Sequence, residues 1–550
     1  MLHRIRQINP KEFLKRIGIS ILVGVVFGLL IGNVNLGIII GIVGGIIFAR
    51  KKMRESGEVV QEKKHKLPGF ESWKTHGIIS LAVLALLLYF FRPWFHELVM
   101  AFYTNPAIIF MIIMAGAGAV LIAKKQKNLG SIALFLALLS LIVLFLTNVI
   151  MGSYIVQEND YNSITALPDT SQVRIIPLGV AWRYLTDSLQ KSTEKVGGLD
   201  ITNINNSLVW TAPRIPDGFI LFLTQKVNGI LIADATKTDR STRLITKELQ
   251  FGEGIGIFDN IYWRIFKTAY FINLGDIYYM QKDGELLTIV PIIQYRFKFP
   301  VMLPYFAGVF VLNENGEISK YRPEEIEGID YFQNNRAYPE YLARLYVDSY
   351  KYKNGILNAW FLHKDQIEIS DVYGQENQQP FLMPTEEGLK WVIATEPYGE
   401  SYGVFKIFLV DAITGRIDML ELNEDQTLTG PVAVVSYVKK RFPNINWQTA
   451  TVLEPRPYVV NNHLYWMLSI TPSDFAGISY TVFVDSTNNN VIAMESDEEI
   501  MNFIEKGVLD VSDKKGPEET SGSIKEQTKN KISEIEKQLE ELKELLEQEN

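Results

Sequence analysis

The sequence predicts an α-helical membrane bundle of five apolar segments, an extracytoplasmic α+β region of tandem helix-plus-antiparallel-sheet modules, and a short C-terminal coiled coil. Three observations predict this fold class. Long apolar runs are confined to the first 152 residues, short alternating runs separated by Gly, Asn and Asp follow to residue 505, and the chain ends in a heptad pattern. With 550 residues, the chain is long enough for several domains.

The apolar runs differ in how well their lengths match a bilayer. About 17–25 helical residues are needed to cross about 30 Å of hydrocarbon. Residues 106–123 and 130–152 meet this requirement. Residues 77–91 meet it only together with residues 92–103, where aromatic residues suit the bilayer interface. The two short runs within 17–50 form either a thin hairpin or a re-entrant pair.

The distribution of Lys and Arg predicts the orientation of these segments. Basic residues concentrate in the N-terminal residues 1–16, in the loop 51–76 and in the loop that begins at Lys124. Basic loops stay in the cytoplasm, and these three lie on one side if every run crosses once. The three membrane helices of residues 77–152 therefore end outside. Residues 153–550 are expected to be extracytoplasmic in a multi-pass cell-membrane protein.

Charge divides the chain at the same place. Residues 1–130 contain 17 Lys and Arg against 6 Asp and Glu, a net charge of +11, which leaves −19 of the total of −8 for the remainder. An acidic exterior argues against nucleic-acid binding, and the basic part is explained by attraction to the lipid bilayer. Arg92, His96 and Glu97 lie near the end of the third expected helix, which favours an interfacial role over transport.

The first hairpin contains two glycine trios with a spacing of four residues. They are Gly24, Gly28 and Gly32, and Gly37, Gly41 and Gly45. This spacing places each trio on one helix face, where two backbones can approach closely. The partner is either the other half of the hairpin or a second chain. The first run lacks a small-x-small site and leads directly into another apolar run, which argues against a cleavable signal peptide.

The outer region suggests four repeats of a helix, an apolar strand and a second strand closed by a polar turn. The modules are expected at about 171–245, 250–325, 335–422 and 428–505. Their helices are expected at 177–190, 257–272, 338–352 and 431–442, and their apolar strands at 218–224, 286–297, 391–395 and 463–470. The alternative is an ordinary α+β region without repetition.

Two shorter patterns relate individual modules. Pro213-Arg214 of the first module matches Pro455-Arg456 of the last. Leu409 to Gly415 reads Leu-Val-Asp-Ala-Ile-Thr-Gly, a strand that ends in a Val-Asp-x-x-Thr-Gly turn, and Asp485 ends a similar strand without the glycine. Over about 340–500 the chain resembles the PepSY domain. The resemblance implies a helix followed by a small sheet, acting as an extracytoplasmic binding or regulatory module without catalytic residues.

Candidate catalytic chemistry is sparse. The absence of Cys excludes disulfides, thiol nucleophiles, Cys-ligated zinc and iron–sulfur clusters. Of the six His, only His363 and His463 lie outside the membrane half, so a His-based zinc site would need both. Ser401 is the centre of a Gly-x-Ser-x-Gly motif. A nucleophile elbow requires a helix after the serine, and the strand-like run that follows predicts a hairpin turn instead.

Two further segments superficially suggest ligand loops. Residues 252–256 are glycine-rich but lack the spacing of a phosphate-binding loop, so a loop entering a helix is predicted. Residues 313–317 lack the distal carboxylate of a calcium loop, so a turn is predicted. The sequence therefore assigns no catalytic, cofactor-binding or metal-binding residue.

The C-terminal tail predicts association. After a polar linker at 506–523, residues 524–550 place apolar side chains at alternating spacings of three and four. These heptad positions are Ile532, Ile535, Leu539, Leu542 and Leu546. So short a coiled coil is stable only with a partner, which favours self-association or docking to another protein.

These observations favour a non-enzymatic membrane protein. Its outer modules are expected to bind a protein, a peptide or an envelope ligand in cell-envelope assembly or scaffolding. One alternative is an extracytoplasmic ligand sensor that signals through the membrane bundle. A second alternative is a membrane-bound hydrolase, which would require Ser401 or a pair of carboxylates to lie in a cleft.

Overall fold

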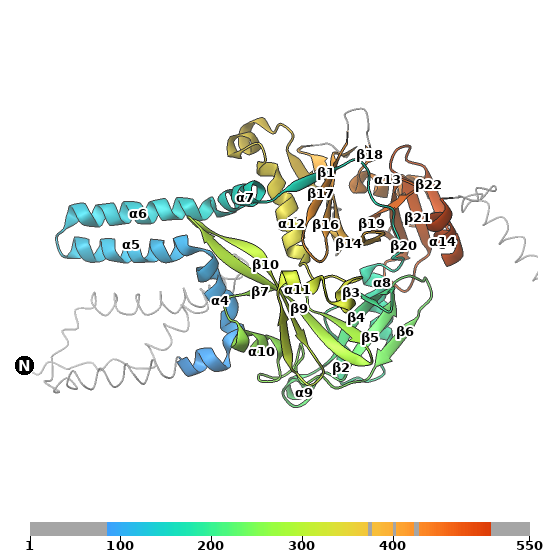
Figure 1. The fold of residues 1–550 in the computed structure, drawn as a ribbon, viewed down its shortest axis with the longest axis horizontal. Helices are drawn as coiled ribbons and strands as arrows, with labels where there is room; N and C mark the ends of the chain where they lie inside the picture. Colours follow the sequence, from blue (N-terminus) through green and yellow to red (C-terminus); the bar gives the residue numbers. More distant parts are fainter. Residues whose placement is uncertain (1–84, 372–376, 400–402, 423–427, 508–550) are drawn as a thin grey trace, which may run out of the picture. The chain divides into compact units, whose positions relative to one another are not determined.

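A computed structural model describes residues 85–371, 377–399, 403–422 and 428–507 of the chain (Figure 1). The chain forms two units, Met1–Leu86 and Leu87–Asn550, and the elements named below lie in the second. The described part consists of two long apolar helices followed by a mixed α+β region with several antiparallel sheets. The predicted fold class is confirmed to this extent.

Helices α5 (Pro106–Ala123) and α6 (Lys127–Phe145) are long and apolar enough to cross a membrane. They lie side by side as an antiparallel pair (Figure 1). Glycine allows their close approach, because a Cβ atom on Gly118 would lie only 2.8 Å from Cγ of Leu134 on the other helix. Most of their remaining side chains are exposed, which suits helices that face lipid.

The other expected spans are not shown. Residues 17–50 lie outside the described residues. The described part of the third expected span is interrupted at Phe91, after which α4 (Arg92–Thr104) starts with a proline in its first turn. The expected span at 130–152 is divided into α6 and α7 (Thr147–Glu158). Helix α7 contacts the α+β region, so it does not continue α6 as one long span.

Four sheets, antiparallel except for the pair β1 (Tyr161–Ile164) and β17 (Ile417–Glu421), make up most of the α+β region. The first contains β2 (Glu194–Val196), β3 (Asp200–Ile204), β4 (Ser207–Pro216), β5 (Ile230–Asp234) and β6 (Thr242–Ile245). The second contains β7 (Asn273–Leu274), β8 (Tyr278–Lys282), β9 (Glu285–Lys298), β10 (Val301–Leu312) and β11 (Ile318–Tyr321). The third contains β1 (Tyr161–Ile164), β12 (Ile367–Ile369), β13 (Phe381–Thr385), β14 (Gly388–Pro397), β16 (Lys406–Asp411) and β17 (Ile417–Glu421). The fourth contains β19 (Ala450–Val460), β20 (His463–Pro472), β21 (Tyr480–Asp485) and β22 (Val491–Met494).

One helix precedes each sheet. These helices are α8 (Leu178–Ser188), α10 (Ile261–Thr268), α12 (Glu340–Ser349) and α13 (Pro431–Arg441). All four sheets then have the same order, in which a first strand pairs with a long second strand, followed by a third and a fourth. In the first three sheets the first strand consists of two segments. In the fourth it is continuous but bulged between Leu453 and Arg456.

Smaller elements connect these sheets. They are α9 (Phe219–Thr224), α11 (Pro323–Ile326), α14 (Asp497–Lys506), the 3₁₀ turns Asp330–Phe332 and Tyr350–Tyr352, the π-helical turn Asn358–Leu362, and the strand pair β15 (Gly403–Val404) and β18 (Leu428–Thr429).

The prediction of a strand at 218–224 is wrong. These residues form α9, and its Phe219 is 79% exposed. A run of six mostly apolar residues has no periodicity that distinguishes a strand from a helix. The second strand of the first sheet is β4 instead, so Pro213-Arg214 lies on a second strand, whereas Pro455-Arg456 lies on the first strand of its sheet. The sequence match between these two pairs therefore does not mark equivalent positions.

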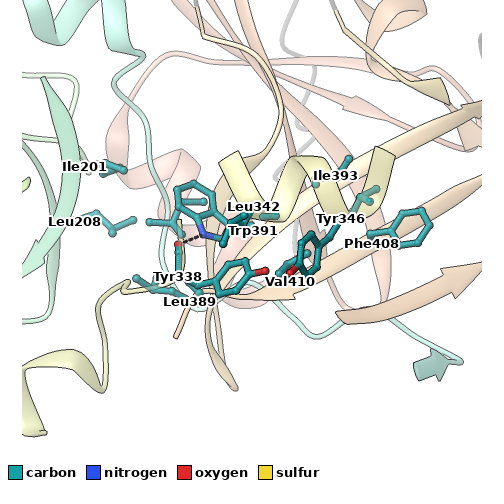
Figure 2. Packing of buried hydrophobic residues seen from close by; sticks show 14 of the residues in the cluster. Ile201, Leu208, Tyr338, Leu342, Tyr346, Leu389, Trp391, Ile393, Phe408 and Val410 are labelled. Carbon is teal, nitrogen blue, oxygen red and sulfur yellow. Dashed lines mark hydrogen bonds between the residues drawn. The ribbon is translucent and has the colours of Figure 1, made fainter. Parts of the chain in front are cut away.

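The hydrophobic core lies between the sheets and includes their helices. Residues of α8, the first sheet, α12 and the third sheet form one cluster, in which Trp391 Nε1 donates to the carbonyl oxygen of Tyr338 at 3.1 Å (Figure 2). A second cluster joins the first sheet, α10 and the second sheet, and a third joins the third sheet, α13 and the fourth. Each helix is thus enclosed between its own sheet and a neighbouring one, which is why the four sheets pack as one body.

Candidate functional site

The residues predicted for helix packing and oligomerisation lie outside the described residues. They are Gly24, Gly28, Gly32, Gly37, Gly41 and Gly45, and Ile532, Ile535, Leu539, Leu542 and Leu546. Ser401 lies outside as well, but its flanks are described. Strand β14 ends at Pro397, and β15 and β16 follow the motif. This is the arrangement of a strand connection, whereas a nucleophile elbow has a helix directly after the serine.

The two loop predictions are confirmed. Gly316 has a positive φ of 79°, and its backbone N–H donates to the carbonyl oxygen of Asn313, which closes a turn between β10 and β11. Residues 252–256 lead into α10, whose first turn is capped by the Asn260 side chain.

The two histidines outside the membrane half lie near different sheets. His363 stacks on Tyr398 near the third sheet, and His463 Nε2 lies 2.9 Å from a carboxylate oxygen of Asp485 in the fourth. Within the described ranges, no three His, Asp or Glu side chains are grouped so that they could hold a metal ion.

Helix α4 contacts α10 through residues that the sequence placed at a membrane interface. Arg92 lies over the rings of Tyr89 and Trp263, and His96 stacks on Phe266 with 3.7 Å between ring centroids. His96 Nε2 also lies 2.9 Å from the carbonyl oxygen of Ile272. These side chains are buried, so they attach the segment before α5 to the second helix–sheet pair. Hydropathy alone could not show this, because the contact joins residues about 174 positions apart.

A buried ionic network joins the start of the first helix to the fourth sheet. Arg174 Nη2 donates to Glu454 at 2.6 Å, and both side chains are 3% exposed. The other Glu454 oxygen accepts from the backbone N–H of Leu178, and Arg456 donates to the carbonyl oxygens of Arg174 and Ile175. Because these charges have partners inside the protein, the network is structural.

A second cluster joins the first sheet to the third helix. The Arg336 guanidinium pairs with Asp200 of β3 and lies over the ring of Tyr278. Burial raises the pKa of Asp200 to about 6, which outweighs the opposing effect of Arg336. Burial, together with the nearby Asp276 and Asp200, raises the pKa of Glu340 to about 8. This junction therefore carries carboxyl groups that are partly protonated near neutral pH.

A large cavity borders the first sheet. Its volume is about 870 Å³, which is within the usual range for ligand pockets. One wall is the end of α8 and the residues after it, including Leu189 and Lys191, and the other is the edge strand β6, including Arg243 and Leu244. The side chain of Leu231 from β5 also lines it.

A buried ion pair lies at the bottom of this cavity. Arg214 Nε donates to Glu194 at 2.8 Å, and both side chains are almost completely buried. Asn228 donates to the other Glu194 oxygen at 3.3 Å, and the exposed Lys191 lies 3.8 Å from it. The charges at the bottom are thus fixed in position by partners, while the walls provide apolar, basic and acidic side chains, the last from Asp187 and Glu248.

A second cavity of about 530 Å³ borders the edge strand β11 of the second sheet. Lys247, which follows β6, lines both cavities and pairs with Glu314 at 2.6 Å. We call the two cavities together the edge groove, because β6 and β11 are the last strands of their sheets. One local pattern could have indicated this groove, namely the alternating residues 242–245 after a polar turn, but the strand predictions did not include it.

The equivalent edge of the third sheet is occupied by another strand. There β1 pairs in parallel with the fourth strand, β17, over four residues. In the fourth sheet, α14 shares a hydrophobic cluster with residues of all four strands, so this helix covers a face of the sheet and not its edge. Among the described residues, the third sheet thus differs from the other three in having a strand added at this topological position.

No protein-family profile and no curated protein sequence matches this chain. Its function must accordingly be argued from the apolar helices, the sheets and the edge groove.

Proposed function

We propose that this protein is a non-enzymatic, multi-pass membrane protein whose extracytoplasmic modules bind a protein, peptide or envelope ligand in cell-envelope assembly or scaffolding. In this proposal the chain has five membrane segments with its N-terminus in the cytoplasm. The observation that carries the binding function is the edge groove, a cavity of about 870 Å³ and one of about 530 Å³ that share Lys247 and border two sheet edges on which no described strand pairs. The common helix–strand order of the four sheets supports the four-repeat interpretation.

The position of the basic loop supports the proposed orientation. Residues 124–126 join α5 to α6, so they lie at the opposite end of this helix pair from α4 and α7. Both α4 and α7 contact the α+β region. If α5 and α6 span the bilayer, the Lys-rich turn and the sheets lie on opposite sides of it, as the distribution of positive charge requires.

A photo-crosslinking amino acid at Leu244 tests the binding function in the native membrane. Leu244 is exposed in the groove wall, and the exposed Lys440 on α13 is the matched control position. We expect a discrete adduct of the full-length protein from position 244 and none from position 440. The same adducts from both positions, or none from position 244, would contradict the proposed site.

A second candidate function is a sensor, and one observation favours it. Helix α7 follows α6 after a single residue, and its Ile155 and Val156 are buried in the core cluster shared by the first and third sheets. A ligand that shifts these sheets would therefore move the end of an apolar helix. Distance measurements between spin labels on α6 and α12, with and without the crosslinked ligand, would test this: an unchanged distance contradicts it.

A further inference from the structure

We infer that the occupant of the edge groove is an extended polypeptide segment that adds a strand to the outer edge of β6. The outer edge is the side of β6 turned away from β5. This inference rests on the proposed binding function and specifies the class of ligand.

The first argument is which backbone groups of β6 point toward β5 and which point outward. The backbone N–H of Asp234 donates to the carbonyl oxygen of Ser241 at 3.1 Å, so this opposed pair is a hydrogen-bonded one. In an antiparallel ladder such pairs alternate. Ile232 and Arg243 therefore form the next hydrogen-bonded pair, and the backbone groups of Thr242 and Leu244 point outward. No described strand pairs with this side, so these groups are available to a ligand.

The shape of the groove is the second argument. The cavity of about 870 Å³ lies between the end of α8 with residues 189–191 and the face of the sheet that packs against α8, because its lining includes Arg214 of β4, Leu231 of β5 and Leu244 of β6. A strand added beside β6 would extend this face and place alternate side chains at the mouth of the cavity. Four residues of β6 correspond to about 13 Å of strand. Leu189, Leu231 and Leu244 line the groove and offer an apolar contact for side chains that alternate along a bound strand. Main-chain hydrogen bonds would then provide affinity, and these side chains would provide specificity.

The third sheet is the third argument, because it shows the proposed arrangement within the chain itself. Strand β1 adds to the fourth strand, β17, which occupies the same place in its sheet as β6 does in the first. The Tyr161 side chain of β1 packs against the rings of Tyr350 and Phe408, at 4.9 and 6.2 Å between centroids. An added strand with one large side chain is therefore compatible with this helix–sheet architecture.

The charges that line the groove predict which peptides should bind best. Arg243 lines the groove, and in the described residues no carboxylate forms an ion pair with it. The three carboxylates of the same lining, Asp187, Glu194 and Glu248, are each paired with another basic side chain. Lys191 is mostly exposed at the opposite wall. Although residues 131–550 carry a net charge of −19, the charge left without an ion pair in this lining is that of Arg243, so peptides with an acidic residue beside an apolar one should bind best.

The test uses the full-length protein in lipid nanodiscs and a random dodecapeptide library displayed on phage. We expect enriched peptides with apolar and acidic residues in alternation. Leu244→Pro should weaken the binding of a synthetic enriched peptide by about tenfold or more, because one main-chain hydrogen bond and the close approach of the strand are lost. Leu244→Ala retains the backbone N–H and should weaken binding by only about two- to threefold.

A second measurement does not depend on the folding of a variant. Amide hydrogen exchange of residues 242–246 in the wild-type protein should slow when the peptide is added, while exchange in β17 should not change. Failure to enrich any peptide overturns the inference, as does equal weakening by both substitutions with unchanged exchange in β6. In these cases a protease-resistant adduct at position 244 would still support the proposed binding function with a non-peptide ligand.

Discussion

The first and third sheets have the same strand order but differ at one edge. Strand β6 ends the first sheet and borders the edge groove, whereas β17 of the third sheet is covered by β1. Unpaired strand edges promote unwanted association, so proteins usually cover or shorten them. In this chain the segment between the apolar helices and the first helix covers one edge and leaves the equivalent one open. This difference is the basis of the inference that a ligand adds a strand at the open edge.

Proline substitutions at matched leucines give the largest expected contrast. Leu420 in β17 has paired strands on both sides, so Leu420→Pro should lower the free energy of unfolding by about 3 kcal/mol or more. Leu244 in β6 has one paired side, and Leu244→Pro should cost less than about 1 kcal/mol, because its N–H faces outward. Denaturant unfolding of the full-length protein in nanodiscs measures both, with alanine at each position as the control. Equal losses would show that the two edges do not differ.

Removing the side chain that secures β1 should have the next largest effect. Tyr161 contacts Tyr350 and Phe408, and its hydroxyl donates to the carbonyl oxygen of Tyr346 at 3.0 Å. Tyr161→Ala should lower the free energy of unfolding by about 2–4 kcal/mol. Tyr161→Phe removes only the hydrogen bond and should cost about 1 kcal/mol. A smaller loss for alanine than for phenylalanine would contradict the role of the ring contacts. Faster exchange in β17 should accompany the alanine variant.

The junction between the two compared sheets should respond to pH. Glu340 has a pKa raised to about 8, whereas an unfolded Glu titrates near 4.3. The folded state therefore retains a proton that the unfolded state has lost, and the free energy of unfolding falls as pH rises from about 4 to 8. The pKa of Asp200, raised to about 6, contributes to the lower part of this range only.

Glu340→Gln separates the two contributions. At pH 9 we expect the variant to be more stable than the wild type by about 1–3 kcal/mol, and at pH 5 the two should be nearly equal. Denaturant unfolding at pH 5, 7 and 9 measures this difference, with the exposed Glu387→Gln as the control. A difference that is the same at all three pH values would show that Glu340 is not the titrating group.

The smallest expected effect concerns the residue shared by the two cavities. Lys247 pairs with Glu314, and both side chains are about one-third exposed or less. Such a pair contributes about 1 kcal/mol at most, so Lys247→Ala should change the unfolding midpoint little. Its effect on an enriched peptide should be larger than its effect on folding. A loss of stability without any change in peptide affinity would show that Lys247 does not take part in peptide binding.

Local sequence patterns predicted most individual elements. The helices at 177–190, 338–352 and 431–442 and the strands at 286–297 and 463–470 lie within two residues of α8, α12, α13, β9 and β20 or overlap them. The pattern failed at 218–224, because a short apolar run has no period and the side chains of α9 are exposed. It also missed β6, so the sequence predicted several elements that line the edge groove but not the strand whose open edge defines it.

Hydropathy and charge along the chain determined two apolar helices at 106–145, a basic N-terminal part and an acidic remainder, because these properties depend only on neighbouring residues. Which sheet edge is open depends on pairing between distant segments. Asn162 of β1 donates to Asp418 of β17 across 256 positions, and no equivalent strand reaches β6 in the described residues. Only the tertiary structure decided this, because a strand edge is satisfied by whichever segment the packing of the whole chain brings beside it.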